Sequence, residues 1–208
     1  MREFYNEIKR YLTPCNTVIV ILNIVIFALQ RILDSGATPA GMTEGGALCW
    51  WLALDGRQYY RLVTYMFLHS GIAHLFNNML VLLFIGSFVE RLAGSGRYLL
   101  NYLCSGVVAG LVSAAYNRWC FESAGSEALV YSIGASGAIF GMVGSLLFIV
   151  ICHRGRIEGV SLRQLLMFLF LSIYAGFTDT GVDNIAHIAG LCFGFTGMAI
   201  LYRRGGYT

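Results

Sequence analysis

The chain has 208 residues, enough for one domain or at most two small ones. Hydrophobic residues make up 57% of it, charged residues make up 12%, and the mean hydropathy is +0.68. Because soluble domains carry about 25% charged residues, this composition excludes a soluble enzyme and a disordered chain. The formal net charge of +3 is too small to indicate a nucleic-acid partner. The composition therefore predicts a polytopic membrane protein.

Six apolar segments between the charged residues are candidate membrane-spanning helices. A helix needs about 20 mostly apolar residues to cross the hydrocarbon core. Runs such as VIVILNIVIFAL are continuously apolar, whereas transmembrane strands would alternate in polarity, so the fold class is predicted to be all-α. One membrane domain is expected over 1–208, with a first loop at 34–73. The expected spans are 14–33, 74–92, 98–116, 133–152, 163–178 and 184–203.

The basic residues predict the orientation, because cytoplasmic loops carry an excess of Lys and Arg. With six spans, both termini lie on one side of the membrane, and ten basic residues fall on that side against four on the other. This asymmetry places both termini in the cytoplasm. The ten are Arg2, Lys9, Arg10, Arg91, Arg97, Arg154, Arg156, Arg163, Arg203 and Arg204. The four on the outer side are Arg31, Arg57, Arg61 and Arg118.

The connection between the first two spans is unusually apolar for a loop. It contains GGALCWWLALDGRQYYRL, in which aromatic residues are interrupted by Gly, Asp and Arg. Trp and Tyr are favoured in the headgroup region of a bilayer. We therefore expect an interfacial element in the first loop, with a simple amphipathic loop as the alternative.

The first polar cluster inside an apolar segment is GASGAIFG, residues 134–141. It places Ser136 near the outer start of the fourth span, between Gly134 and Gly137. Gly137 and Gly141 share a helix face, and this spacing of small residues lets another helix approach closely. Ser136 is a candidate nucleophile here, although on this motif alone it could equally be a small packing residue.

The second cluster is DNIAHIAGLCFG, residues 183–194, in the outer part of the sixth span. His187 lies close to a second stripe of small residues, formed by Gly190 and Gly194. A buried histidine is as often a structural residue or part of a proton relay as a catalytic base. The motif by itself therefore leaves these alternatives open.

The two clusters together are more informative than either one. Ser136 and His187 each lie about three residues below the start of a span, which at 1.5 Å per residue is about 5 Å in depth. Two glycine-striped helices can pack face to face and bring these side chains together. A serine at hydrogen-bond distance from a histidine is an activated nucleophile, since the imidazole takes the hydroxyl proton as the oxygen attacks a carbonyl.

The third cluster is HSGIAHLFNN, residues 69–78, at the outer start of the second span. His74 and Asn78 are four residues apart and lie on one helix face. As hydrogen-bond donors they could stabilise an oxyanion, with the backbone N–H of Ser136 as a third donor; helix capping or loop tethering is the alternative. His69 is expected to pack or bond within the loop. The chain contains no HExxH motif, so no metal site is expected.

Taken together, the three clusters resemble the rhomboid intramembrane serine proteases. GASGAIFG resembles the GxSGxxxG motif of that family, AHIAG with Gly194 resembles its final-helix motif, and His74-x-x-x-Asn78 resembles its oxyanion element. The resemblance covers essentially the whole chain, in the six-helix form. The further residues on which it rests are Gly134, Gly137, Phe140, Gly141, Gly190, Gly194, Arg61 and Glu90.

The resemblance implies roles for the supporting residues. Ser136 and His187 would form a catalytic dyad, with the ring of Phe140 against the histidine at a position where a tyrosine is frequent. Arg61 would be the arginine of the first loop, where Tyr60 replaces the usual tryptophan. Glu90 would be a structural residue at the inner end of the second span. Asp183 is a candidate third catalytic residue, but we expect it at the solvated mouth of the site.

The resemblance also implies the activity. It predicts an endopeptidase that cleaves transmembrane segments of other membrane proteins through an acyl-enzyme, in the lipid bilayer, without cofactor, metal or nucleic acid. The expected location is the bacterial plasma membrane, with the active site open to the outer side. The alternative is a catalytically silent rhomboid-like protein that binds membrane helices, but the presence of both dyad residues favours the protease.

Overall fold

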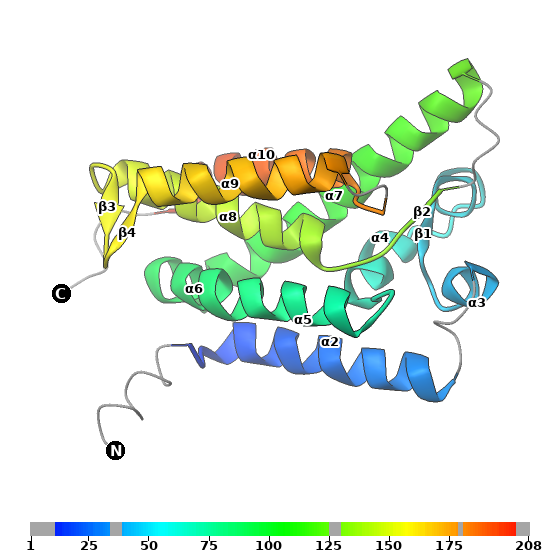
Figure 1. Ribbon diagram of the computed structural model, residues 1–208, viewed down its shortest axis with the longest axis horizontal. Helices are drawn as coiled ribbons and strands as arrows, with labels where there is room; N and C mark the ends of the chain where they lie inside the picture. The colour runs from blue at the N-terminus through cyan, green and yellow to red at the C-terminus, as the bar shows by residue number, and fades with distance from the viewer. Residues whose placement is uncertain (1–10, 34–38, 125–129, 179–180, 203–208) are drawn as a thin grey trace.

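Helices make up most of the chain that the computed structural model describes, which comprises residues 11–33, 39–124, 130–178 and 181–202 (Figure 1). The main helices are α2 (Pro14–Ile32), α5 (Ile72–Val81), α6 (Ser87–Ala93), α7 (Ser95–Ala124), α8 (Ser136–Cys152), α9 (Leu162–Thr178) and α10 (Asn184–Leu201). The short helical elements are α3 (Pro39–Glu44), η1 (Trp51–Asp55), α4 (Arg61–Thr64), η2 (Tyr65–Phe67) and η3 (Leu82–Gly86). The strands are β1 (Leu48–Cys49), β2 (Tyr131–Ser132), β3 (Arg156–Ile157) and β4 (Val160–Ser161).

Four stretches of the described chain are long and apolar enough to cross a membrane: α2, the continuous segment 72–93 formed by α5, η3 and α6, most of α7, and α10. Two shorter apolar helices, α8 and α9, lie beside them. Large apolar side chains are exposed around the bundle, among them Ile32, Phe170 and Ile200, which is 84% exposed. The predicted membrane-embedded helical bundle is therefore confirmed.

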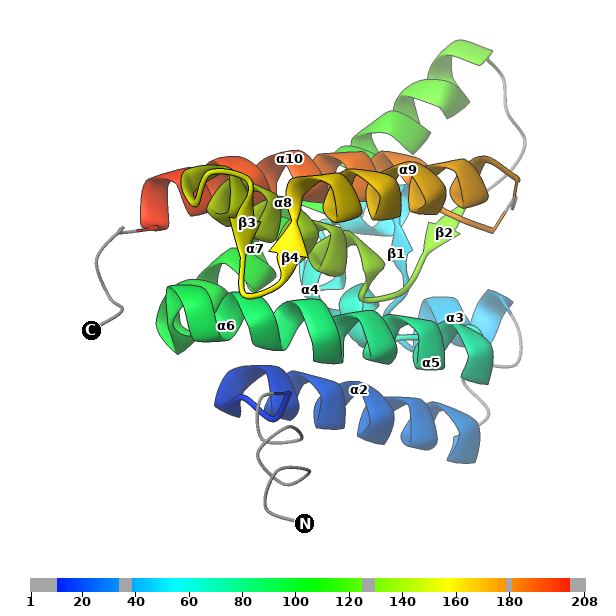
Figure 2. The same ribbon diagram turned by 60° about the vertical axis from the view of Figure 1, so that its left-hand side comes forward.

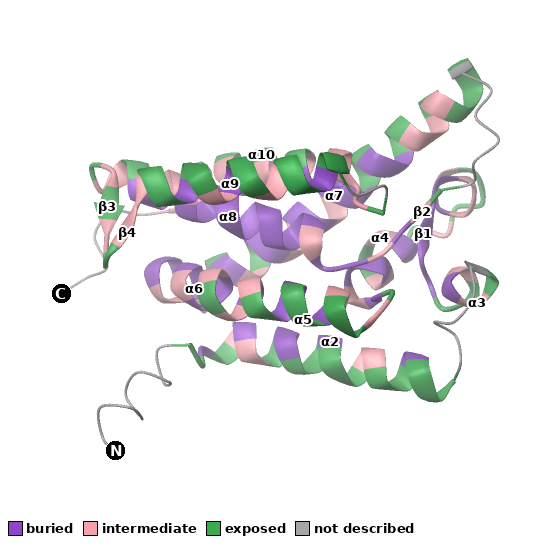
Figure 3. Ribbon diagram, viewed as in Figure 1, coloured by how far each residue is buried: buried purple, intermediate pink, exposed green. Residues whose placement is uncertain are grey.

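The central helix of this bundle is α8, of which 12 of 17 residues are buried (Figure 3). A helix that is apolar on all sides is buried by its neighbours, and α8 packs against α10 and α7. On one side of the bundle α2 lies along α5 and α6, whereas α9 lies on the opposite side, beside α10 (Figure 2). The starts of α8 and α10 thus lie at one end of the bundle, in contact with each other.

Glu90 joins α6 to the beginning of α2. Its carboxylate accepts hydrogen bonds from the backbone N–H groups of Cys15 and Asn16, at 2.9 and 2.8 Å, and from the Ser95 hydroxyl at 2.6 Å. The first N–H groups of a helix have no partner within the helix and favour a negative charge. The side chain of Glu90 therefore caps α2 and fixes it against α6.

The second span contains a π-helical turn, η3, at its middle. A π turn leaves a carbonyl without its usual helical partner, and the Asn16 side-chain amide donates to the Leu82 carbonyl at 3.0 Å and to the Ser87 hydroxyl at 2.9 Å. The buried hydroxyl of Tyr98 donates to the other end of the Asn16 amide. A polar side chain of α2 thus satisfies the irregular turn inside the bundle.

The first loop is organised around the buried side chain of Arg61. Its guanidinium donates to the carbonyls of Thr43 and Ala47, at 2.6 and 2.8 Å, and to the Gln58 side chain at 2.7 Å. Strand β1 of this loop pairs antiparallel with β2, which precedes α8. The first loop therefore holds the segment that leads into α8.

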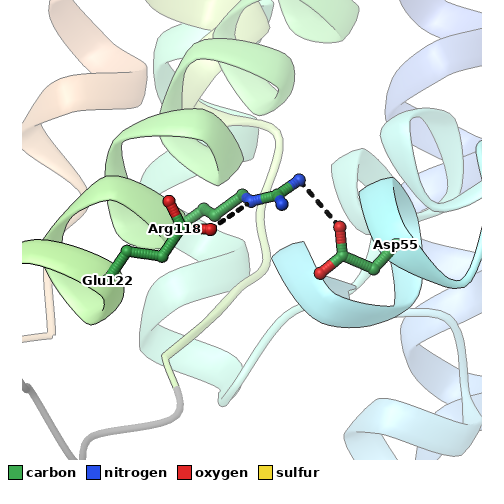
Figure 4. A network of polar contacts seen from close by, with 3 residues as sticks. All are labelled: Asp55, Arg118 and Glu122. Carbon is green, nitrogen blue, oxygen red and sulfur yellow. Dashed lines mark hydrogen bonds and ion pairs between the residues drawn. The ribbon is translucent and has the colours of Figure 1, made fainter.

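Helix α7 continues to Ala124, beyond the end expected near residue 116. Charged residues end the apolar segment here, but they do not end the helix. The last turns of α7 extend past the other helices of the bundle, where charged side chains can be accommodated (Figure 1). There Arg118 bonds to Asp55 of η1 at 2.7 Å and to Glu122 at 2.8 Å (Figure 4). These contacts join the extension of α7 to the first loop.

Candidate active site

Ser136 is the first residue of α8, and His187 lies in the first turn of α10. The Ser136 Oγ and the His187 Nε2 are 2.9 Å apart, which is a hydrogen bond. The serine is half-buried and the histidine is buried. Ser136 and His187 are therefore in contact, as expected from the two glycine-striped helices that carry them.

The two helices meet backbone to backbone next to this pair. A Cβ at Gly190 would collide with the carbonyl oxygen of Gly137, and a Cβ at Gly194 would collide with that of Gly141. Glycine is therefore required where α10 crosses α8, because any side chain would separate the helices. This close approach brings Ser136 and His187 within hydrogen-bond distance of each other.

The ring of His187 is held flat against the ring of Phe140. The two ring centroids are 4.1 Å apart and the planes differ by 8°. Phe140 follows Ser136 by one helical turn, so the stacking surface and the hydroxyl belong to the same helix. Stacking restricts the imidazole to an orientation in which Nε2 faces the Ser136 hydroxyl.

The carboxylate of Asp183 is bonded to groups other than the His187 ring. One carboxylate oxygen accepts from the backbone N–H of Ala186 at 2.9 Å and so caps α10, and the other accepts from the hydroxyls of Ser113 and Ser132, at 2.5 and 2.7 Å. The His187 Nδ1 is buried and has no hydrogen-bond partner among the described residues. Asp183 is half-buried rather than at an open mouth, since it joins α10 to α7 and β2. An aspartate directly before an apolar helix is a typical N-cap.

His74 and Asn78 converge on the backbone just before Ser136. A Cβ at Gly134 would lie 2.9 Å from the His74 Nε2 and 3.7 Å from the Asn78 Nδ2. Gly134 has a φ of +120°, a conformation that side chains rarely adopt, and its missing side chain leaves room between the donors and the serine. The Asn78 amide nitrogen is buried and has no partner among the described residues. As the first residue of α8, Ser136 also has a backbone N–H that the helix cannot use.

Two further polar residues of the third cluster, His69 and Asn77, differ in their exposure. His69 is fully buried outside the spans, and burial lowers the pKa of its imidazole to about 4, so that it is neutral. Its ring lies edge-on to that of His74, with centroids 5.0 Å apart. Asn77 is exposed. Among the described residues no group of three or more His, Cys, Asp or Glu side chains could hold a metal ion.

Arg61 and Glu90 lie away from the serine and the histidine. Arg61 holds the first loop and Glu90 holds α2, as described above. Two positioning residues were missed from the sequence: Asn16, which bonds the π-helical turn, and Ser113, which bonds Asp183. A short polar side chain inside an apolar span signals a buried hydrogen bond, but it does not name the partner.

Residues 56–204 match the family described as Rhomboid domain. The chain is 34% identical over 182 residues to the rhomboid protease GluP of Bacillus subtilis, an alignment that covers 88% of this chain and 34% of GluP. YdcA of the same bacterium is 33% identical over 146 residues, 69% of this chain and 68% of YdcA. RHOMBOID-like protein 7 of Arabidopsis thaliana is 33% identical over 162 residues, 77% of this chain and 48% of the plant protein.

The chain therefore spans about a third of GluP and about half of the plant relative. The family match covers most of the chain, from Gly56 in the first loop to residue 204, beyond the end of α10 at Leu201. It includes the segments that carry Ser136, His187, His74 and Asn78. This chain belongs to the rhomboid family.

Proposed function

We propose that the protein is an intramembrane serine endopeptidase that cleaves transmembrane segments of other membrane proteins through a Ser136–His187 dyad. The observation that carries this proposal is the 2.9 Å hydrogen bond between the Ser136 Oγ and the His187 Nε2. It occurs in a chain of a family whose bacterial member GluP is named a protease. A hydroxyl activated by an imidazole attacks carbonyl carbon, so the reaction type is acyl transfer to water.

The reaction proceeds in two halves. His187 Nε2 takes the proton of Ser136 while the oxygen attacks the peptide carbonyl, and the oxyanion that forms is bound by His74, Asn78 and the Ser136 N–H. The imidazolium then gives its proton to the leaving amine, which breaks the peptide bond and leaves an acyl-enzyme. A water molecule, deprotonated by the same histidine, attacks the ester and releases the second product with regeneration of Ser136.

Hydrolysis inside a membrane requires access to water. His74, Ser136 and His187 lie in the first turns of α5, α8 and α10, and Asn78 lies one turn further along α5. The proposed reaction requires this end of the bundle to open to the aqueous phase. A transmembrane helix hides its carbonyls in internal hydrogen bonds, so the substrate must unwind before attack. Segments that contain Gly or Pro unwind at lower cost and are the expected substrates.

The basic residues support an orientation with this end outside and both termini in the cytoplasm of a bacterial cell. Arg31 and Arg118 lie at the end with the dyad, whereas Arg91 and Arg156 lie at the other end, near the β3–β4 hairpin. The first loop, with its Trp and Tyr residues, would lie at headgroup level. Five basic residues that contribute to the orientation lie outside the described residues: Arg2, Lys9, Arg10, Arg203 and Arg204.

Labelling with a fluorophosphonate, which reacts with activated serines, tests the dyad. We expect the wild type to be labelled and Ser136→Ala and His187→Ala to be unlabelled, because one removes the nucleophile and the other its base. The matched control is Ser161→Ala, which removes the serine at the end of β4 and should label as the wild type does. Equal labelling of all four proteins contradicts the dyad, and the absence of labelling from all four favours the alternative of a silent protein that binds membrane helices.

Asp183→Asn distinguishes a dyad from a triad. The amide oxygen can still cap α10, so we expect kcat to stay within about 10-fold of the wild type, whereas the loss of a triad aspartate costs about 10⁴-fold. Asp183→Ala removes the cap and should lower the free energy of unfolding by about 0.5–2 kcal/mol. Cleavage kinetics and thermal unfolding in detergent measure both effects. A loss of activity in Asp183→Asn comparable to that in His187→Ala would show that the aspartate takes part in the chemistry.

A further inference from the structure

The side chain of His74 has two ring nitrogens with different surroundings. Its Nε2 faces the space next to Gly134, and its Nδ1 lies 3.1 Å from the Ser70 Oγ. A neutral imidazole carries one proton, so one nitrogen donates and the other accepts. Only the form with the proton on Nε2 can donate to an oxyanion beside Ser136.

We propose that Ser70 is a positioning residue, which donates its hydroxyl proton to the Nδ1 of His74 and so keeps the ring proton on Nε2, toward the oxyanion. The inference rests on the proposed protease function, in which His74 binds the oxyanion. With the proton on Nδ1 instead, a lone pair of Nε2 would face the oxyanion and repel it. The bond from Ser70 also fixes the rotation of the ring about its χ2 angle.

Ser70 itself is held in place from α2. Its carbonyl accepts a hydrogen bond from the Arg31 guanidinium at 2.8 Å, and the preceding N–H, that of His69, donates to the Gln30 side chain at 3.2 Å. Arg31 and Gln30 are consecutive residues in the last turn of α2. The backbone of His69 and Ser70 is therefore bonded to the last turn of α2 at two points.

The hydroxyl of Ser70 is not used to cap α5. The N-cap residue of α5 is Gly71, and no side chain caps this helix. A serine near a helix start normally bonds the free N–H groups of the first turn, but here its hydroxyl is bonded to the imidazole one turn further on. This leaves the hydroxyl available to orient His74, while the edge of the buried His69 ring limits the imidazole from another side.

A double-mutant cycle tests whether Ser70 acts through His74. We expect Ser70→Ala to lower kcat about 3- to 10-fold with little change in KM, the effect of one neutral hydrogen bond. Ser70→Thr keeps the hydroxyl and should retain most of the wild-type kcat. In the His74→Ala background, Ser70→Ala should have no further effect, because the residue that it positions is gone. Independent, multiplicative losses would show that Ser70 only stabilises the loop and would overturn the inference.

The protonation state of the ring provides a second test that does not need activity. Nitrogen-15 NMR of the His74 ring in detergent-solubilised wild type should show a protonated Nε2 and a hydrogen-bonded, unprotonated Nδ1. The signal of a hydrogen-bonded Nδ1 should be lost in Ser70→Ala and kept in Ser70→Thr. A wild-type ring protonated mainly on Nδ1 would refute the inference even if the dyad is active. If the fluorophosphonate labelling fails but this ring state is found, the protease function is wrong while the contact between Ser70 and His74 stands.

Discussion

Replacing Gly190 by alanine should destabilise the protein and abolish most of its cleavage activity. Alanine in a helix is ordinarily more favourable than glycine by up to about 1 kcal/mol. At this position, however, the new Cβ would collide with the Gly137 carbonyl oxygen, and backbone cannot move aside as a flexible side chain can. We expect a loss of about 1–3 kcal/mol, or several degrees in Tm at about 2–4 °C per kcal/mol. Gly190→Val should be worse.

Activity should fall further than stability, because the two dyad residues lie on the two helices that are forced apart. A displacement of about 1 Å between reacting groups can cost about 10²-fold in rate. The matched control is Gly96→Ala in α7, where a Cβ would meet nothing within 4 Å, and this variant should be as stable and active as the wild type. Thermal unfolding and cleavage of a transmembrane substrate in detergent or liposomes measure the two effects. Full activity of Gly190→Ala would contradict the close approach of α8 and α10.

The helical membrane architecture could be predicted because the hydrocarbon core imposes a length and an apolar composition on each span. The stripes of small residues likewise predict close helix packing. Glycine has no side chain, so a facing helix can approach its backbone directly. The end of α7 could not be placed from hydropathy, because charges end an apolar window without ending a helix. Its last turns are joined to the first loop by Arg118, whose partner Asp55 is 63 positions earlier in the chain.

The sequence does not determine the hydrogen-bond partners of several polar residues, because these partners lie far away in the chain. The order of the motifs suggests that Ser136 and His187 meet, but which side chain Asp183 contacts depends on where α7 and β2 pass. The same holds for Asn16, whose partners are Leu82, the first residue of the π turn, and Ser87, which follows it. No local sequence pattern predicts this turn. Polar residues in apolar spans can thus be recognised as important, while their partners require the three-dimensional arrangement.

Replacing Asn78 by alanine should lower kcat about 10²–10³-fold with little change in KM, the usual cost of losing one oxyanion donor. Its amide nitrogen is buried, lies close to Gly134 and has no partner among the described residues. A buried donor without a partner is costly in the resting protein, and a negative charge that appears beside Ser136 during the reaction would satisfy it. This difference between ground state and transition state is the reason to expect the effect in kcat.

The neighbouring Asn77 offers a matched control, since it is the same residue type on the same helix but is exposed. Asn77→Ala should cleave at the wild-type rate, and thermal unfolding of both variants separates lost chemistry from lost stability. Fluorophosphonate labelling of Asn78→Ala should be slowed rather than abolished, because the Ser136–His187 pair is intact. A kcat within threefold of the wild type, or an equal loss in Asn77→Ala, would remove Asn78 from the oxyanion site. The donors would then be His74 and the Ser136 N–H, and the unpartnered amide would need a different explanation, such as a bond to the unwound backbone of the substrate.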